Sequence, residues 1–274
     1  MELRIEKFDF IPGLTPLSSW RAPVAAVCTY LIVLVAARLV VVWRGSFRDV
    51  LKPVVLVHNA FLSGLSAVLL MALCLELYWE YASAGYGMSG MWAVWCDPPP
   101  RLFTKGRLYA IYYANYLVKF YEMLDTVIMV LRNNPVPFLH VYHHSATLVL
   151  CWSQLHAHST TMWVPISLNL LVHVFMYFYY AVATLGVKVW WKRHLTTMQI
   201  VQFIIDVGVC AWATALKYGH DTGMSWGVDC GGTTLAGYFG TGLLLSYLVL
   251  FINFYIFNYV FKRVHGKPRL KKDA

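Results

Sequence analysis

Three histidines, His140, His143 and His144, fall within five residues of the segment LHVYHHSAT. Their i, i+3, i+4 spacing places them on one face of a helix. A neutral imidazole is a nucleophile and a general base near neutral pH. A lone histidine in an apolar segment is usually a packed, hydrogen-bonded residue, whereas three on one face indicate a site that does chemistry.

A second polar face lies in the segment KFYEMLDT, where Lys119, Glu122 and Asp125 recur every three residues. At about 100° per residue, these side chains share one side of a helix. Each charge at the centre of a membrane helix costs about 2.5–3.5 kcal/mol, so the three should face the protein interior and partly neutralise each other. Two interpretations stay open: a buried ion-pair clamp between helices, and groups that set the tautomer and protonation of nearby histidines.

The segment NLLVHVFMYFYY carries a third polar stripe, with Asn169, His173 and Tyr177 at helical spacing beside Met176 and Tyr180. An aromatic stripe alone is typical of packing. An amide and an imidazole inside it favour a functional face, because such groups can hydrogen-bond a developing oxyanion.

The segment TTMQIVQFIID adds Gln199, Gln202 and Asp206 on one face. Hydrogen bonding between helices is the ordinary role of such glutamines. Asp206 could pair with a protonated histidine or with Lys119.

The composition indicates an all-α integral membrane protein that forms one domain over residues 1–274. The chain is 59% hydrophobic and only 13% charged, with a mean hydropathy of +0.57, whereas soluble domains average about 25% charged residues. The N-terminus carries both charge signs and does not resemble a cleavable signal peptide. Apolar segments of suitable length predict a bundle of about seven transmembrane helices, near residues 22–43, 54–78, 107–131, 139–156, 161–184, 196–216 and 235–261. The fourth is short enough to be re-entrant, and six or eight spans are alternatives.

Lys and Arg residues concentrate on one side of the seven-span topology, which predicts that side to be cytosolic. The short N-terminus, 1–21, would then be lumenal, and the basic tail, 262–274, cytosolic. All four polar faces would fall at one depth, which predicts a single polar chamber near the cytosolic face that opens on an apolar tunnel. The net charge of +9 reflects this topology, and we expect no nucleic-acid partner.

Two features lie outside the helices. Lys271 and Lys272 sit at the fourth and third positions from the end, where a cytosolic dilysine resembles an endoplasmic-reticulum retrieval signal, although a plain basic tail would look the same. Cys96 and Cys230 fall in two lumenal loops and could form a disulfide in an oxidising compartment. From the residues alone, pairing and no pairing are equally open.

Three kinds of chemistry fit such a chamber. A His-x-x-His-His box is also found in membrane di-iron desaturases and hydroxylases, but these need about eight or more histidines. Only His140, His143, His144 and His173 reach the chamber, with His58 as an additional candidate, so two metals lack ligands while one metal stays an alternative. A non-enzymatic transporter could use the charges as a proton relay. Acyl transfer is the other enzymatic interpretation, in which the histidines, the hydrogen-bond donors and the apolar tunnel would all be used.

The sequence resembles the ELO family of very-long-chain fatty acid elongases, in its fungal branch. The matching segments are KFYEMLDT, FLHVYHH, NLLVHVFMYFYY and TTMQIVQF, in that order, between about residues 107 and 215. The resemblance implies a seven-helix enzyme of the endoplasmic reticulum, a 3-ketoacyl-CoA synthase (an acyltransferase). It would join acyl-CoA to malonyl-CoA without a metal or other cofactor and release CO2 and CoA.

The resemblance also implies roles for individual residues. His143 would carry the acyl group as an acyl-imidazole, with His173 acting beside it and with His140 and His144 positioning or activating it. Supporting positions would be Lys119, Glu122, Asp125, Asn169, Tyr177, Gln199 and Gln202. The family likeness favours a Cys96–Cys230 disulfide and, as partners, membrane lipid and the ketoreductase, dehydratase and enoyl reductase of the elongation cycle, with a homodimer as one arrangement. Acyl chain length and unsaturation do not follow from the sequence.

Overall fold

The protein is a bundle of long helices in a computed structural model that describes residues 8–85, 87–97 and 105–261. The described residues form α1 (Arg21–Arg44), α2 (Lys52–Ser83), α3 (Gly87–Cys96), α4 (Gly106–Leu131), α5 (Phe138–His156), α6 (Trp163–Thr184), α7 (Lys192–Asp221) and α8 (Thr234–Tyr255). A 3-10 turn, η2 (Thr160–Met162), precedes α6, and a π-helical segment, η3 (Ile256–Phe261), continues α8. Lys271 and Lys272, predicted to form a retrieval signal, and the tail 262–274 lie outside these ranges.

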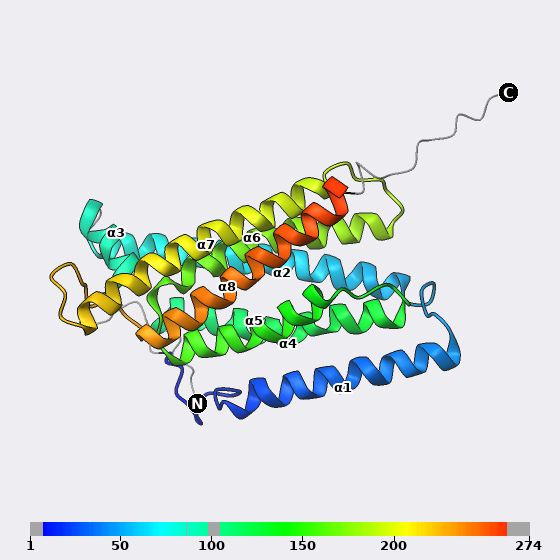
Figure 1. The fold of residues 1–274 in the computed structure, drawn as a ribbon, viewed down its shortest axis with the longest axis horizontal. Coiled ribbons are helices and arrows are strands. Elements are labelled where there is room, and N and C mark those ends of the chain that lie inside the picture. The colour runs from blue at the N-terminus through cyan, green and yellow to red at the C-terminus, as the bar shows by residue number, and fades with distance from the viewer. Residues whose placement is uncertain (1–7, 86, 98–104, 262–274) are drawn as a thin grey trace.

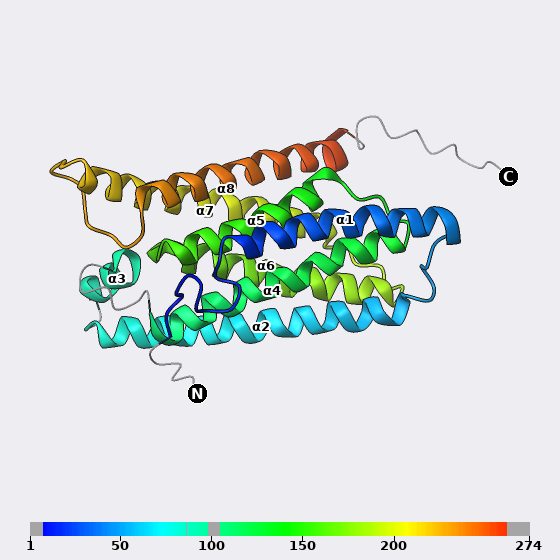
Figure 2. The same ribbon diagram turned by 90° about the horizontal axis from the view of Figure 1, so that it is seen from below.

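Six of the long helices form a ring. Contacts run from α4 to α5, α8, α7, α6 and α2 and back to α4, while α1 packs outside this ring against α4 and α5. Successive long helices run in opposite directions, so that α1 and α8 end at the same end of the bundle (Figure 1). We call this the C-terminal end, and the opposite end, where residues 8–20 lie, the N-terminal end. Figure 2 shows α1 lying across α4 and α5.

Helix ends follow from local chemistry. Pro53 occupies the first turn of α2, where its missing N–H costs nothing. The Thr233 hydroxyl accepts a hydrogen bond from the Ala236 N–H and caps α8. Gly45 follows α1 with a φ of 84°, a conformation that glycine adopts without strain and that reverses the chain towards α2.

The predicted seven spans correspond to the seven long helices in the described residues, with boundaries shifted by a few residues. Five segments are long and apolar enough to cross a membrane: Arg21–Arg44, Lys52–Ser83, Thr160–Thr184, Lys192–Asp221 and Thr234–Phe261. The remaining two, α4 and α5, carry the charged and histidine faces and lie in the ring. The 19 residues of α5 form one continuous helix, about 28 Å long and close to a bilayer core. The re-entrant alternative is therefore not what the structure shows.

The outward surface is apolar, as a membrane requires. Leu31, Ile32 and Val35 on α1 are exposed, as are Leu245 and Val249 on α8. A soluble protein rarely exposes apolar patches of this extent. The bundle is thus an integral membrane protein whose polar groups turn inward.

The N-terminal end is closed by two elements that the span prediction left as loops. Residues 8–20 pack on α4 and α5, where Phe10 is buried and the Trp152 indole donates to the Ser18 carbonyl at 2.7 Å. The short helix α3 ends at Cys96, which forms a disulfide with Cys230 in the α7–α8 loop. This bond links α3 to the other side of the ring across a separation of 134 residues.

We expect the disulfide to stabilise the N-terminal end of the bundle. Under denaturing conditions, alkylation should modify the four free cysteines before reduction and all six afterwards. Cys96→Ser should lower the apparent melting temperature in detergent, consistent with about 2–4 kcal/mol for a bridge that closes a long loop.

Cys74→Ser is the matched control, because Cys74 is an exposed free thiol, and it should leave the melting temperature unchanged. Six modified cysteines without reductant would contradict the disulfide.

Candidate functional site

A cavity of about 540 Å³ occupies the C-terminal end of the ring. Side chains from α2, α4, α5, α6, α7, α8 and η3 line it. Its histidine, charged and amide side chains are His58, Asn59, Asp125, Arg132, Asn134, His140, His143, His144, Asn169, His173, Lys192, Gln199 and Gln202. Each of the four polar faces expected from the sequence therefore contributes at least one side chain to the same cavity. Lys119, Glu122, Tyr177 and Asp206 do not line it.

The three histidines of α5 form one cluster in this cavity. The ring centroids of His140 and His144 lie 4.5 Å apart, and those of His143 and His144 lie 5.8 Å apart. His143 packs against Tyr247 at 4.8 Å, and Phe203 and Phe251 complete an aromatic wall from α7 and α8. Within the described residues, His143 Nδ1 is buried and has no hydrogen-bond partner. The ring is thus enclosed, and this nitrogen is not committed to another group.

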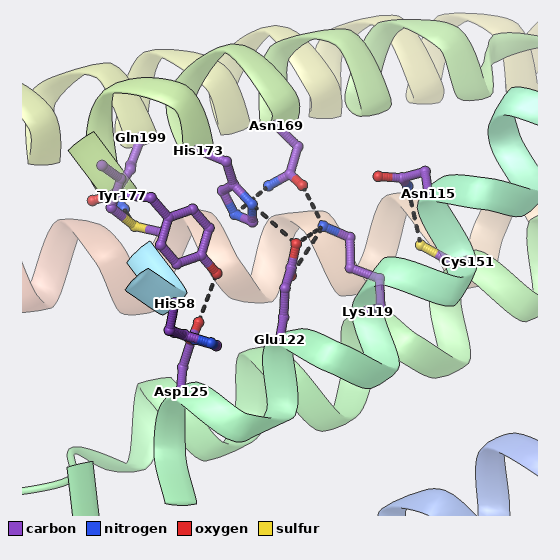
Figure 3. Close-up of polar contacts among 11 residues, drawn as sticks. His58, Asn115, Lys119, Glu122, Asp125, Cys151, Asn169, His173, Tyr177 and Gln199 are labelled. Atoms are coloured by element: carbon purple, nitrogen blue, oxygen red, sulfur yellow. Dashed lines mark hydrogen bonds and ion pairs between the residues drawn. The ribbon is translucent and has the colours of Figure 1, made fainter. Parts of the chain in front are cut away.

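Behind the opposite wall, a charged network joins α4 to α6 (Figure 3). Lys119 Nζ donates to Glu122 Oε1 at 2.9 Å and to Asn169 Oδ1 at 2.8 Å. Glu122 Oε1 lies 3.2 Å from His173 Nδ1. The Asn169 amide nitrogen lies 3.2 Å from His173 Nε2. Both ring nitrogens of His173 therefore have a polar neighbour, although the contact of Nδ1 with Glu122 is an ion-pair distance without hydrogen-bond geometry.

Asp125 belongs to a different network, although it shares a helix face with Lys119 and Glu122. One of its oxygens contacts His58 Nε2 on α2, and the other accepts from the Tyr177 hydroxyl at 2.6 Å. His58 Nδ1 lies 3.2 Å from the Tyr121 hydroxyl. The sequence raised His58 only as an additional candidate. Only its position in the second apolar segment pointed to it, since a single histidine forms no spacing pattern with other polar residues.

Gln199 and Gln202 line the cavity from α7, whereas Asp206 lies one turn further along and is fully buried. Asp206 Oδ2 accepts from Gln202 Nε2 at 3.2 Å. The suggested pairing of Asp206 with a protonated histidine or with Lys119 is not what the structure shows: Asp206 contacts Gln202, and Lys119 is held by Glu122 and Asn169. Gln199 Nε2 lies 3.7 Å from Met176 Sδ, a weak acceptor.

A second, smaller cavity of about 90 Å³ lies towards the N-terminal end. Its wall includes Leu150, Cys151, Ile166, Cys210 and Leu244. It is therefore mainly apolar and lies deeper in the ring than the histidines. Across residues 8–85, 87–97 and 105–261, no three His, Cys, Asp or Glu side chains are grouped so as to hold one metal ion.

The fold and the site define a helical membrane protein with a histidine-lined cavity at one end of its bundle. Residues 15–267 match the model of the ELO family, described as GNS1/SUR4. The chain therefore belongs to the ELO family.

Curated relatives agree with this assignment. The chain is 37% identical to "Putative fatty acid elongase 1" of Schizosaccharomyces pombe over 93% of this chain and 74% of that protein. It is 34% identical to "Fatty acid elongase A" of Dictyostelium discoideum over 98% of this chain and 93% of the relative. "Very long chain fatty acid elongase 4" of Macaca mulatta is 34% identical over 61% of this chain and 51% of that protein. The resemblance inferred from the four segments is thereby confirmed.

We expect the Lys119–Glu122 pair to stabilise the bundle mainly by mutual neutralisation. Lys119→Met leaves Glu122 as a buried carboxylate without its cation, and breaking a buried pair typically costs about 3–5 kcal/mol. The double variant Lys119→Met/Glu122→Gln should recover much of this loss, measured as the melting temperature in detergent.

The double-mutant cycle supplies its own control. If the two single substitutions and the double variant are additive, the ion pair does not couple these residues and this interpretation of the network is wrong.

Proposed function

We propose that this protein is the condensing enzyme of fatty acid elongation, a very-long-chain 3-oxoacyl-CoA synthase. It would convert an acyl-CoA and malonyl-CoA into a 3-ketoacyl-CoA two carbons longer, with release of CO2 and CoA. One observation carries the proposal: the histidines of the His-x-x-His-His segment and His173 line a single cavity. The names of the relatives, all fatty acid elongases, support the same reaction class.

The protein offers a place for both parts of an acyl-CoA, the CoA phosphates and the acyl chain. Arg132 and Lys192 line it near the C-terminal end, where cationic groups can hold the phosphates of CoA. Arg132 Nε is buried without a hydrogen-bond partner among the described residues, so it is free to take one from a ligand. The smaller cavity towards the N-terminal end, with Leu150 and Leu244 in its wall, would take the far end of the acyl chain.

In the first half-reaction, a ring nitrogen of His143 attacks the thioester carbon. The C–S bond breaks, the acyl group becomes an acyl-imidazole, and the ring N–H proton passes to the departing sulfur to give free CoA. Gln199 would donate to the developing oxyanion, because it lines the same cavity as His143 and, among the described residues, its amide nitrogen contacts the weak acceptor Met176 Sδ. His140 and His144 lie beside His143 on α5 and would position its ring.

In the second half-reaction, malonyl-CoA loses CO2, and the electron pair of the broken C–C bond attacks the acyl carbon. The C–N bond to His143 breaks, and the imidazole takes up a proton. His173, held by Glu122 and Asn169, would orient the malonyl thioester. The aromatic wall of Tyr247, Phe203 and Phe251 would exclude the water that could hydrolyse the acyl-imidazole.

The proposal includes the protein's setting. The reaction needs no metal or other cofactor, since both substrates are activated as thioesters. We place the protein in the endoplasmic reticulum membrane as one domain, with the C-terminal end of the bundle towards the cytosol, where soluble CoA esters are available. Its product would be substrate for a ketoreductase, and the later cycle would use a dehydratase and an enoyl reductase.

Purified protein supplied with labelled malonyl-CoA and a panel of acyl-CoAs should form a labelled 3-ketoacyl-CoA with release of CO2. His143→Ala should lower this turnover by at least about three orders of magnitude, as loss of a nucleophile does in other enzymes. His156→Ala is the matched control, because His156 lies on the same helix at its exposed far end, stacked on Trp152. It should retain full turnover.

Absence of label in product for every chain length, in a folded wild-type sample, would overturn the proposal. Iron-dependent insertion of a double bond would point instead to a desaturase, and transport without release of CoA would point to a carrier.

A further inference from the structure

His58, Asp125, Tyr177 and Tyr121 form a hydrogen-bonded cluster that the reaction scheme has not used. Asp125 contacts His58 Nε2 through one oxygen and accepts from the Tyr177 hydroxyl through the other. The Tyr121 hydroxyl meets His58 Nδ1 at 3.2 Å. His58 and Asp125 both line the histidine cavity, although their side chains are only 6% and 12% exposed. The cluster is therefore part of the site and not of the outer surface.

The geometry of this cluster prevents His58 from binding a substrate directly. Both nitrogens of its ring are engaged, and Asp125 has a donor on each oxygen. A group so fully bonded can act only through its neighbours. Two neighbours lead towards the other histidines: Tyr177 has its ring 5.2 Å from that of His173, and Asp125 shares the cavity wall with His140.

A histidine beside Asp125 indicates more than neutralisation of a buried carboxylate. A lysine would serve as a permanent counterion for Asp125, as Lys119 does for Glu122. An imidazole is the side chain that gains and loses a proton near neutral pH. A histidine and a carboxylate in contact can share one proton, and the carboxylate can stabilise the protonated imidazole.

The two half-reactions proposed above differ in their need for such a proton. In the first, the proton lost by the His143 ring goes to the CoA sulfur, so no proton is needed from any other group. In the second, malonyl-CoA enters as a carboxylate and leaves CO2, so it supplies no proton to the departing imidazole. That proton must come from the protein or from solvent.

We propose that His58 is a positioning residue which, with Asp125, stores the proton that returns to His143 during condensation. The pair gives up one proton through groups in the cavity as the C–N bond to His143 breaks, and it is recharged from the solvent at the C-terminal end. This inference rests on the proposed condensing activity and assigns a role to a residue outside its four sequence segments.

The test separates the two half-reactions. Acyl-enzyme formed with acyl-CoA alone is followed by intact-protein mass, and its discharge by added malonyl-CoA is followed by rapid quench. His58→Gln keeps a donor towards Asp125 but cannot store a proton. We expect its acylation rate to stay within about twofold of wild type and its discharge to slow by roughly tenfold or more, since positioned proton transfer contributes at least that much. Val57→Ala, at an exposed neighbouring position on α2, should leave both rates unchanged.

Asp125→Asn provides a second variant that should show the same selective loss if His58→Gln does not fold. Normal discharge in the folded variants would overturn the inference, and so would an equal loss in both half-reactions, which indicates a structural role. If the wild-type protein forms no condensation product at all, the proposed function fails and not merely the role of His58.

Discussion

The buried Lys119–Glu122 ion pair is the interaction on which the site depends. A charge inside an apolar bundle is tolerated only when it is neutralised and hydrogen-bonded. Lys119 and Glu122 satisfy each other on α4, and their remaining hydrogen-bonding capacity is directed to Asn169 and His173 on α6. This requirement constrains the rotation of both helices: turning α4 would leave its charges facing lipid, and turning α6 would take Asn169 and His173 away from them.

The cavity follows from that constraint and has two unlike halves. On one side, α2, α4 and α6 contribute the charged networks around His173 and Asp125. On the other side, α7 and α8 surround His143 with Tyr247, Phe203 and Phe251. The imidazole proposed to carry the acyl group thus lies in the aromatic half, while the groups that can hold charge face it across the cavity. Such a division keeps water away from a reactive acyl group and leaves acid–base groups within reach.

Helical periodicity was sufficient to predict much of this arrangement. Spacing alone placed Lys119, Glu122 and Asp125 on one face, because a helix repeats every 3.6 residues whatever its surroundings. Membrane lengths gave the seven spans, and the requirement that polar groups turn inward brought the faces together. Cys96 and Cys230, whose pairing was open from the residues alone, are joined in the structure.

The hydrogen-bond and ion-pair partners of these polar side chains were not predictable in the same way, because they depend on which helices become neighbours. Asp125 pairs with His58 only because α2 packs beside α4, and Asp206 lacks a cation because α7 lies across the ring from Lys119. The helix α3 was missed since it is too short to span a membrane and lies in a connection. These features are set by packing between segments far apart in the chain, and a single sequence does not encode that order in its local spacing.

The central claim is that the imidazole of His143 accepts the acyl group, and peptide mapping of the trapped intermediate tests it most directly. Protein incubated with an acyl-CoA in the absence of malonyl-CoA would be quenched, digested and analysed by tandem mass spectrometry. We predict one acyl group on the peptide that contains His143, located on that residue by fragmentation and discharged when malonyl-CoA is added before the quench. An acyl group located on His173 or Cys151, or product formation with no acyl-enzyme at all, would contradict the claim.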